Sequence, residues 1–371
     1  MRLNHLALRH FRNLQNQDLE LPPEGVALVG DNAQGKSNFL EAIYYLETLR
    51  SFRGARDEQM VKFGEDVFRV AGTAEEEGRK GEISAAFQRK GKRKKVSIDG
   101  SEPERMSDAL GGLSAVIFSP VDIELVSGGP RERRRFLDIV LSLNEPGYLA
   151  ALQTYNKVLQ RRNAALKSGG SAPSVAAWDP GLLESGARVM IERRRWVACR
   201  SKAFGDYYVK VSSGARARIL YRPSVASPEG DTLEDFECAF RDALLGSCER
   251  ERRMGTTVVG PHRDDVRLQL EDDKEGLDLR DYGSGGQRRT AALALRLVEA
   301  MTIRERRSQR PIILLDDVFA ELDDGRSGRI LDLIESEDMG QVVLTAPKDS
   351  DVRIREDQLP RWRIEAGKIQ S

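Results

Sequence analysis

The segment that most constrains this chain is residues 30–38, with the sequence Gly-Asp-Asn-Ala-Gln-Gly-Lys-Ser-Asn. It follows a short apolar run, residues 26–29, and it precedes a helical pattern over residues 39–46. A strand, a glycine-rich loop, Lys-Ser and a helix in this order are typical of a phosphate-binding P-loop. The glycines let backbone N–H groups surround phosphates, and the helix N-terminus adds the positive end of a dipole. The pattern therefore predicts that the chain binds a nucleoside triphosphate.

Two side chains of this loop have distinct expected roles. Lys36 is expected to bind the outer phosphates, and the Ser37 hydroxyl is expected to complete the shell of a Mg²⁺ ion. Contacts to the nucleotide are expected from Gly30, Asn32, Ala33, Gln34, Gly35, Lys36, Ser37 and Asn38. Arg12 and Asn13 lie between two short predicted strands. They are either further contacts to the phosphates or the base, or a polar hairpin tip, and both interpretations stay open.

Composition limits the classes of protein that fit. With 371 residues, 40% of them hydrophobic, the chain can form two or three domains with real cores. Lys and Arg together number 59, as do Asp and Glu, which argues against a surface coated in DNA-binding charge but allows local basic patches. The cysteines lack the spacing of a metal site. No apolar run reaches the roughly 18 residues that span a membrane, and no signal-peptide pattern is present. We expect a soluble, cytoplasmic protein without a membrane partner.

Residues 51–100 contain short alternating segments that predict β-hairpins. One of the predicted turns, residues 89–95, is strongly basic. Basic runs bind nucleic-acid phosphates by releasing counterions, whereas a solvated hairpin tip is the alternative interpretation. The candidate DNA contacts in this run are Lys92, Arg93, Lys94 and Lys95.

The middle of the chain is predicted to be mostly helical, since residues 145–167 and 181–211 place apolar side chains at helical spacing. A Gly- and Ser-rich segment, residues 168–174, is expected to be a flexible connector between them. Arginine clusters at 161–162 and 193–195 are either solvated faces or DNA-facing surfaces. No heptad pattern is sustained, so we expect no long coiled-coil arm.

After the predicted helical region the α/β pattern restarts, and Ser284 precedes Gly285, Gly286 and Gln287 at the start of a strongly apolar helix. A helix start with small residues leaves backbone N–H groups open, which provides a second anion site. Taken alone, this motif would be an ordinary N-cap. Its value depends on the carboxylates that follow.

A predicted buried parallel strand, residues 311–315, ends in Asp316 and Asp317. Ligands lie at the carboxyl ends of such strands. Asp316 is therefore expected to hold Mg²⁺, directly or through water, and Asp317 to orient the attacking water. The last core strand, residues 341–344, is expected to bring Thr345 to the same edge of the sheet.

The ordered motifs resemble those of the ABC-type ATPase heads of transporters, structural-maintenance-of-chromosomes (SMC) proteins and RecF. Two stretches resemble the RecF family in particular. Residues 120–138 contain Pro-x-Asp and then Gly-Gly-Pro-x-x-Arg-Arg-Arg-Phe-Leu-Asp, and residues 314–323 are Leu-Leu-Asp-Asp-Val-Phe-Ala-Glu-Leu-Asp. Phe-Arg-Asn at 11–13 and Gly-Pro-His-Arg-Asp-Asp at 260–265 also fit. The resemblance extends from the first predicted strand to about residue 365.

The resemblance implies an α/β fold of the P-loop ABC/SMC-type head, a mixed sheet with helices and antiparallel β-hairpins. Residues 1–114 and 251–371 would form this head, and residues 115–250 a mostly helical inserted domain. It also implies an ATP-dependent homodimer with two composite sites. The residues that would act across the dimer are Ser284, Gly286 and Gln287 at the γ-phosphate of the partner, with Glu321 and Asp323 at the dimer seam.

The function implied by the resemblance is DNA repair. Proteins of the RecF family bind DNA as ATP-bound dimers, and with RecO and RecR they help load the strand-exchange protein RecA at single-strand gaps. The implied enzyme is a slow ATPase, stimulated by DNA, that uses ATP and Mg²⁺. A transporter ATPase subunit, a chromosome-organising head, and a scaffold that binds ATP without hydrolysing it are the alternatives.

The chain departs from the pattern of transporter heads at several positions. Asp317 replaces the usual Glu, and a carboxylate one methylene shorter reaches roughly 1.5 Å less far. Thr345 stands where transporters have a histidine, and a hydroxyl is a poor base. Both departures predict slow turnover. The γ-phosphate-sensing glutamine has only candidates here, Gln59 and the loop at 120–122, and Val121 stands where an acidic residue is expected.

Overall fold

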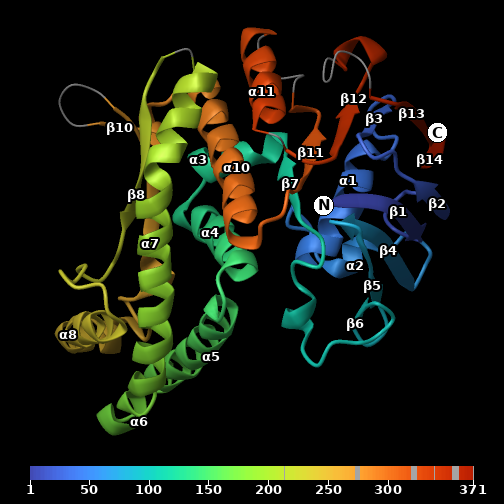
Figure 1. The fold of residues 1–371 in the computed structure, drawn as a ribbon. Helices are drawn as coiled ribbons and strands as arrows, with labels where there is room; N and C mark the ends of the chain where they lie inside the picture. Colours follow the sequence, from blue (N-terminus) through green and yellow to red (C-terminus); the bar gives the residue numbers. More distant parts are fainter. Residues whose placement is uncertain (213, 272–275, 319–323, 338, 353–358, 371) are drawn as a thin grey trace. The chain divides into compact units, whose positions relative to one another are not determined.

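The computed structural model describes the whole chain except residues 213, 272–275, 319–323, 338, 353–358 and 371 (Figure 1). Its contacts divide the chain into two compact units. The first unit comprises Met1–Ile123, Lys210–Ser212 and Ala292–Ser371, and the second comprises Glu124–Val209 and Ser213–Ala291. The sequence analysis predicted the boundaries of a head and an inserted domain. A division by contacts does not test whether these parts fold separately, so the predicted boundaries stay a prediction.

The first unit contains a six-stranded sheet that carries the P-loop, with the strand order β14-β13-β3-β12-β11-β7. Its strands are β3 (Gly25–Val29), β7 (Ala115–Phe118), β11 (Ile312–Asp316), β12 (Val342–Ala346), β13 (Arg361–Glu365) and β14 (Lys368–Gln370). All neighbours pair in parallel except β14, which is antiparallel to β13. The four strands β3, β7, β11 and β12 are buried along their whole length, as expected for a parallel sheet covered on both faces. The strands predicted at 26–29 and 311–315 are confirmed as β3 and β11.

The strand predicted at 341–344 is present as β12, but the prediction that it is the last core strand is wrong. Strand β13 follows β12 in the chain and pairs in parallel with β3, so the strand before the P-loop lies inside the sheet. Only Trp362 and Ile364 of β13 are buried, between exposed Arg and Glu side chains. This alternation is typical of a half-buried strand. The sequence analysis looked for continuous apolar runs, which predict fully buried parallel strands, and therefore missed β13.

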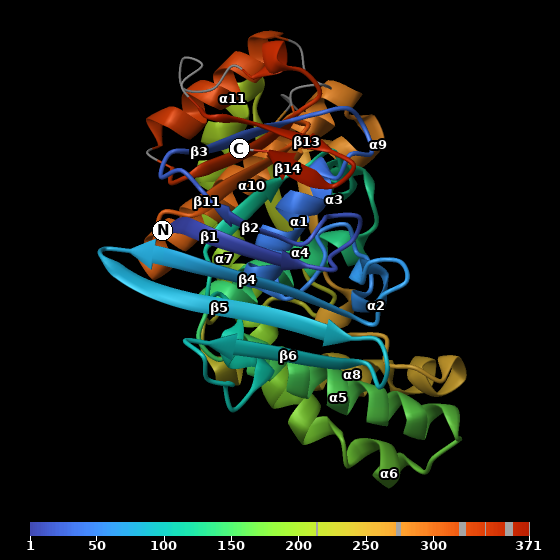
Figure 2. The same ribbon diagram turned by 90° about the vertical axis from the view of Figure 1, so that its right-hand side faces the viewer.

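The second sheet of this unit is antiparallel, with the order β2-β1-β4-β5-β6 (Figure 2). Its strands are β1 (Arg2–Arg9), β2 (Gln17–Glu20), β4 (Val67–Glu76), β5 (Arg79–Gln88) and β6 (Arg93–Ile98), which confirms the predicted hairpins. The turn predicted at 89–95 is too long, because Arg93, Lys94 and Lys95 pair with β5 as part of β6. Helix α1 (Lys36–Thr48) packs against strands of both sheets, and its side chains belong to one core shared with them. The other helices are α2 (Asp57–Met60), α11 (Asp324–Ser336) and the 3₁₀ helices η1 (Met106–Ala109), η2 (Pro120–Ile123) and η5 (Asp349–Asp351).

The second unit is mostly helical, as predicted. Its helices are α3 (Glu124–Ser127), α4 (Pro130–Asn144), α5 (Tyr148–Lys167), α6 (Ala172–Ala176), α7 (Asp179–Ser212), α8 (Leu233–Met254), α9 (Leu279–Tyr282) and η3 (Pro261–Arg263). Helix α10 (Gly285–Arg307) begins in this unit and ends in the first, and the last residues of α7 also count with the first. A small antiparallel sheet is formed by β8 (Ala217–Arg222), β9 (Asp265–Leu270) and β10 (Leu277–Asp278). The expected flexible connector at 168–174 contains the start of α6, where Pro173 occupies the first helical turn.

Two arginines of the predicted surface clusters are part of the interior. Arg162 is 2% exposed and binds Asp179 at 2.8 Å and Glu251 at 2.7 Å. Arg193 is also 2% exposed and binds Asp138 at 2.7 Å. Both interpretations of these clusters, a solvated face and a DNA-facing surface, are wrong for these two side chains. Each is buried and neutralises carboxylates inside the second unit.

Candidate nucleotide site

The P-loop joins β3 to α1, and its glycines have the backbone geometry that the motif requires. Gly35 has φ +116°, and a Cβ there would lie 2.9 Å from Asn13 Oδ1, so the loop can take this path only with glycine. Lys36 is 4% exposed, and its Nζ donates to the carbonyl oxygens of Gly30, at 2.7 Å, and Asp31, at 3.2 Å. The ammonium group thus curls back over the loop, where incoming phosphate oxygens could replace these carbonyls.

The carboxyl edge of the parallel sheet brings the predicted catalytic side chains beside the P-loop. Asp316 of β11 is in register with Thr345 of β12, whose Oγ1 lies 3.3 Å from Asp316 Oδ1 and 3.2 Å from Asp317 Oδ1. The backbone N–H of Asp317 donates to the same hydroxyl at 3.0 Å, and Lys36 Nζ lies 3.9 Å from Asp317 Oδ2. Asp317 has φ +46°, a value uncommon among residues other than glycine, at the end of the strand. The structure therefore gathers Lys36, Asp316, Asp317 and Thr345 at one point.

The side chain of Asp316 has the surroundings of a metal ligand. It is 5% exposed, and burial raises its pKa above the ordinary value, with Asp317 adding to the rise, although a hydrogen bond from Ser37 opposes it. A buried carboxylate of this kind gains from a nearby cation. The carboxylate and the Ser37 hydroxyl are oxygen donors, which Mg²⁺ prefers, so both side chains fit a magnesium ion shared with the phosphates.

Ser119 is a further contact to this carboxylate that the sequence analysis missed. Its Oγ lies 3.4 Å from Asp316 Oδ2, at the carboxyl end of β7. The rule that drew attention to Asp316 would have found it, since both residues end neighbouring parallel strands. Of the two candidates for a γ-phosphate sensor, the loop at 120–122 begins next to Ser119. The Gln59 side chain instead accepts the Arg56 N–H at 2.8 Å and caps α2.

Arg12 does not point freely into the loop region, because it is clamped by Glu41 of α1. The guanidinium binds the two Glu41 oxygens at 2.8 and 3.1 Å, and Arg53 and Ser51 bind the same carboxylate at 2.6 and 2.5 Å. Glu41 is fully buried, which by itself would raise its pKa, but these hydrogen bonds hold the pKa below the usual value. The sequence analysis did not predict this cluster.

Asn13 and the turn between β13 and β14 hold the P-loop from outside. Asn13 Nδ2 donates to the Ala33 carbonyl at 3.3 Å, and its Oδ1 accepts from Asn38 at 2.7 Å. Gln34 Oε1 accepts the Ala366 N–H at 2.6 Å, and the Gln34 carbonyl accepts the Gly367 N–H at 3.0 Å. The turn between β13 and β14 is therefore part of the support of the phosphate loop, which the sequence did not indicate.

Ser284 begins α10 with the reciprocal hydrogen bonds of a capping box. Its Oγ accepts the Gln287 N–H at 3.2 Å, while Gln287 Oε1 accepts the Ser284 N–H at 2.8 Å. Ser284 and Gly285 are exposed, and Gly286 is half-buried. The helix start is thus preformed and open. The predicted seam residues, Glu321 and Asp323, lie outside the described residues.

Three of the four candidate DNA contacts in the basic turn have carboxylate partners within the chain. Lys92 binds Glu58 at 2.8 Å and Lys94 binds Asp57 at 2.8 Å. Lys95 binds Glu102. Arg93 is exposed, and the described residues place no carboxylate in an ion pair with it. The DNA role of these four residues stays a prediction. Arg93 is the candidate most available for a phosphate, because it has no ion pair among the described residues.

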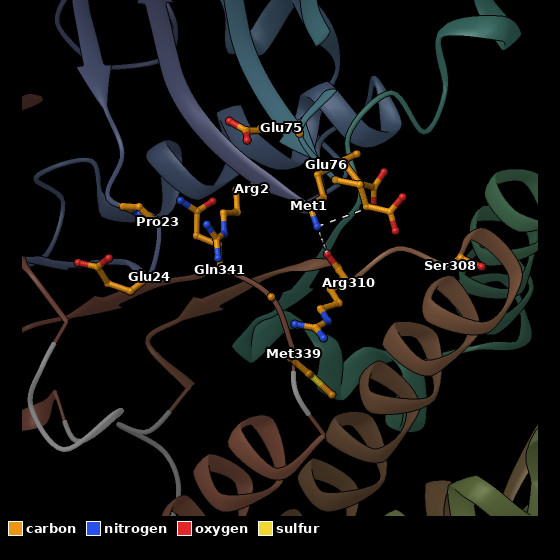
Figure 3. A pocket seen from close by; sticks show the side chains of 13 residues that line it. Met1, Arg2, Pro23, Glu24, Glu75, Glu76, Ser308, Arg310, Met339 and Gln341 are labelled. Carbon is orange, nitrogen blue, oxygen red and sulfur yellow. Dashed lines mark hydrogen bonds and ion pairs between the residues drawn. The ribbon is translucent and has the colours of Figure 1, made fainter. Parts of the chain in front are cut away.

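A separate pocket of about 740 Å³ lies at the other edge of the parallel sheet (Figure 3). It is lined by residues that precede β3, β11 and β12, among them Glu24, Arg310 and Gln341, and by the turn between β4 and β5. It is therefore distinct from the carboxyl edge where the P-loop lies. Among the residues that the structure describes, no group of three or more His, Cys, Asp or Glu side chains could hold a metal ion.

The fold and this site define a P-loop ATPase head of the ABC/SMC type. A family model described as the RecF/RecN/SMC N-terminal domain matches residues 2–359. The DNA replication and repair protein RecF of Synechococcus sp. (strain JA-3-3Ab) is 39% identical over 342 residues, which cover 90% of this chain and 89% of that protein. RecF of Geotalea daltonii is 33% identical over 374 residues, covering all of both chains. This chain belongs to the RecF family.

Solved structures agree with this assignment. The recombination mediator protein RecF-ATP in the RecFOR pathway is similar with a TM-score of 0.90 and 33% identity, and the match covers 100% of this chain and 97% of that one. An Smc head bound to the C-winged helix domain of ScpA is similar with a TM-score of 0.56 and 18% identity, which shows the shared fold alone. The described helices form no long coiled coil, as predicted, and none of them is long and apolar enough to cross a membrane.

Proposed function

We propose that this chain is a recombination mediator that binds ATP and DNA, closes as an ATP-dependent homodimer and reopens by slow ATP hydrolysis. The observation that carries the proposal is the meeting of Lys36, Asp316, Asp317 and Thr345 at the carboxyl edge of the parallel sheet. A related RecF is described with ATP, which supports ATP as the nucleotide. A cytoplasmic location follows for a protein whose substrate is chromosomal DNA in bacteria, the source of these relatives.

Each side chain of the cluster has a proposed task. Lys36 exchanges its carbonyl partners for the outer phosphate oxygens. Ser37 and Asp316 would hold Mg²⁺, which would neutralise charge on the phosphates. Asp317 orients the attacking water, and the Thr345 hydroxyl fixes both carboxylates in place. Since the Asp317 carboxylate reaches less far than a glutamate and the Thr345 hydroxyl is a poor base, turnover is slow, below the enzyme median of roughly 10 s⁻¹.

The second half of each site is proposed to come from the partner subunit. The start of α10 supports this, because Ser284 and Gly285 are exposed at the N-terminus of a preformed helix. Gly286 and Gln287 would complete the contact to the γ-phosphate, with Glu321 and Asp323 at the seam. One dimerisation equilibrium would then couple ATP binding to DNA binding in both directions.

The partners are proposed from the family. The similar RecF structure is described as part of the RecFOR pathway, which supports RecO and RecR as partners. DNA with a single-strand gap, on which RecA is loaded, is the proposed substrate. The name of the relatives, DNA replication and repair protein RecF, supports a DNA substrate.

The test is sedimentation of the full chain with ATP, with ADP and without nucleotide. We expect Lys36→Arg to weaken the ATP-dependent dimer and Asp317→Asn to trap it, with Lys80→Arg, an exposed lysine of β5, as the matched control. Mixing Lys36→Ala with Ser284→Arg protein should restore part of the ATPase activity, because a mixed dimer keeps one intact composite site. A chain that stays monomeric with every nucleotide would refute the composite site, and rapid turnover by the wild-type protein alone would refute the slow switch.

A further inference from the structure

Phe63 is the most exposed large hydrophobic side chain among the described residues, with a relative exposure of 100%. It lies in a tight turn in which the Glu65 N–H donates to the Lys62 carbonyl at 3.1 Å. The third residue of the turn, Gly64, has φ +85°, and a Cβ on it would meet nothing within 4 Å. The turn therefore projects its aromatic ring into open solvent.

The base of this turn is firmly held. Val61 is 4% exposed and forms a β-bridge with the fully buried Phe11. The Lys62 N–H donates to the His10 carbonyl at 2.8 Å, and the Arg12 N–H donates to the Met60 carbonyl at 2.7 Å. The exposed ring thus sits on a fixed backbone, and little conformational entropy would be lost when it contacts a ligand.

Exposed cations lie in a neighbouring turn. The turn between β5 and β6 is bound to the same segment, since the Arg89 N–H donates to the Asp66 carbonyl at 2.8 Å and its guanidinium to the Val61 carbonyl at 3.4 Å. Lys90 of that turn and Arg93, the first residue of β6, are exposed, and the described residues hold neither in an ion pair. A single large apolar side chain among charges is too small a patch for a stable protein–protein interface. It matches a ligand that has both a flat apolar surface and negative charge, which is the chemistry of an unpaired nucleotide.

We propose that this aromatic tip, defined as Phe63 with Lys90 and Arg93, contacts DNA where a duplex meets a single strand. The Phe63 ring stacks on the first unpaired base, and Lys90 and Arg93 lie against the neighbouring phosphates. This proposal rests on the proposed DNA-binding function and names the part of the surface that recognises the junction. A continuous duplex, including its blunt end, has phosphates that the cations can bind. It has no unpaired base on which the ring can stack.

The test compares full-length Phe63→Ala and Phe63→Trp with the wild type, on one fluorescent duplex and on the same duplex with a single-strand gap, with ATP present. Leu245→Ala, at another exposed hydrophobic residue (67% exposed, on α8), is the matched control. We expect Phe63→Ala to weaken junction binding about tenfold while duplex binding changes less than about twofold, because one base–aromatic stack is lost. Phe63→Trp and Leu245→Ala should bind both substrates as the wild type does.

Two further measurements separate stacking from charge. A 2-aminopurine at the first unpaired position should be quenched by the wild type and by Phe63→Trp, but not by Phe63→Ala. Lys90→Glu and Arg93→Glu should each lower the slope of log affinity against log salt by about 1 on both substrates.

The failure of this proposal is distinguishable from failure of the proposed function. If the wild type binds no DNA with ATP, the DNA-binding function itself is refuted. If the wild type binds, but Phe63→Ala keeps full junction affinity and quenching, only the aromatic tip is refuted. An equal loss on duplex and junction, or a loss of binding to a protein partner with unchanged DNA binding, also overturns the assignment of Phe63 to an unpaired base.

Discussion

The buried ion pair between Asp122 and Arg296 allows a quantitative prediction. Arg296 Nη2 lies 2.6 Å from Asp122 Oδ1, and Nη1 lies 2.7 Å from Glu299 Oε2. Asp122, Arg296 and Glu299 are 6%, 8% and 2% exposed. Asp122 Oδ2 also accepts the Ser119 N–H at 2.9 Å, which holds Ser119 next to the proposed magnesium ligand. One carboxylate thus serves both the core and the site.

We expect Asp122→Asn to lower the free energy of unfolding by about 3 kcal/mol. Two unit charges about 4 Å apart attract by about 4 kcal/mol at an effective dielectric constant of 20. Removing one partner of a buried pair costs about 3–5 kcal/mol. The lower value applies because Glu299 still neutralises Arg296 in the variant. Since an amide offers only one acceptor oxygen, Ser119 also loses its fixed position, and ATP binding should weaken together with stability.

The assay is a double-mutant cycle by urea denaturation with Asp122→Asn, Arg296→Met and both changes together. The coupling energy should be about 2–3 kcal/mol, and 0.5 M salt should hardly change it because the pair is buried. The exposed pair of Lys202 and Asp206, 2.7 Å apart on α7, is the matched control, with an expected coupling of about 0.5 kcal/mol or less. A coupling for the buried pair no larger than that of the control, or one abolished by salt, would refute this reasoning.

Three further predictions concern the site and its surroundings. Thr345→Ala should slow ATP hydrolysis about tenfold with little change in the dissociation constant of ATP, measured by phosphate release and by calorimetry, because the hydroxyl positions the two carboxylates only. Gly367→Ala should weaken ATP binding, since a Cβ there would lie 2.1 Å from the Asn13 carbonyl oxygen; unchanged calorimetry would count against the support by this turn. Burial raises the pKa of Glu47 to about 7, whereas in the unfolded chain this group loses its proton near pH 4.5. The contribution of Glu47 to the free energy of unfolding therefore falls as the pH rises from 4.5 to 7. Glu47→Gln should therefore gain up to about 3 kcal/mol relative to the wild type between pH 5 and pH 8 in urea unfolding; a constant difference would contradict it.

The sequence predicted those parts of the site in which a short local motif is enough to indicate the role of a residue. Lys36 and Ser37 follow a glycine loop, and Asp316 follows a continuous apolar run, so local pattern was enough for both. The edge of a parallel sheet then brought them together without any knowledge of the strand order.

The missed parts depend on contacts between segments far apart in the chain. Nothing in the sequence near Gln34 indicates that the β13–β14 turn will bind it, because its bonds involve backbone groups of residues 366–367. Glu41 looks like an ordinary helix residue until Arg12 and Arg53 are seen on either side of its carboxylate. Arg162 and Arg193 look like surface charges for the same reason, since their carboxylate partners lie on other elements.

The position of β3 within its sheet has a consequence for biosynthesis. The ribosome completes β3 and the P-loop early, yet both neighbours of β3, strands β12 and β13, are among the last segments to be translated. Until they emerge, the nascent loop lacks its flanking strands and its contact to residues 366–367, so a truncated chain should be unable to retain nucleotide. The nucleotide site would therefore form only after nearly the whole chain has been synthesised.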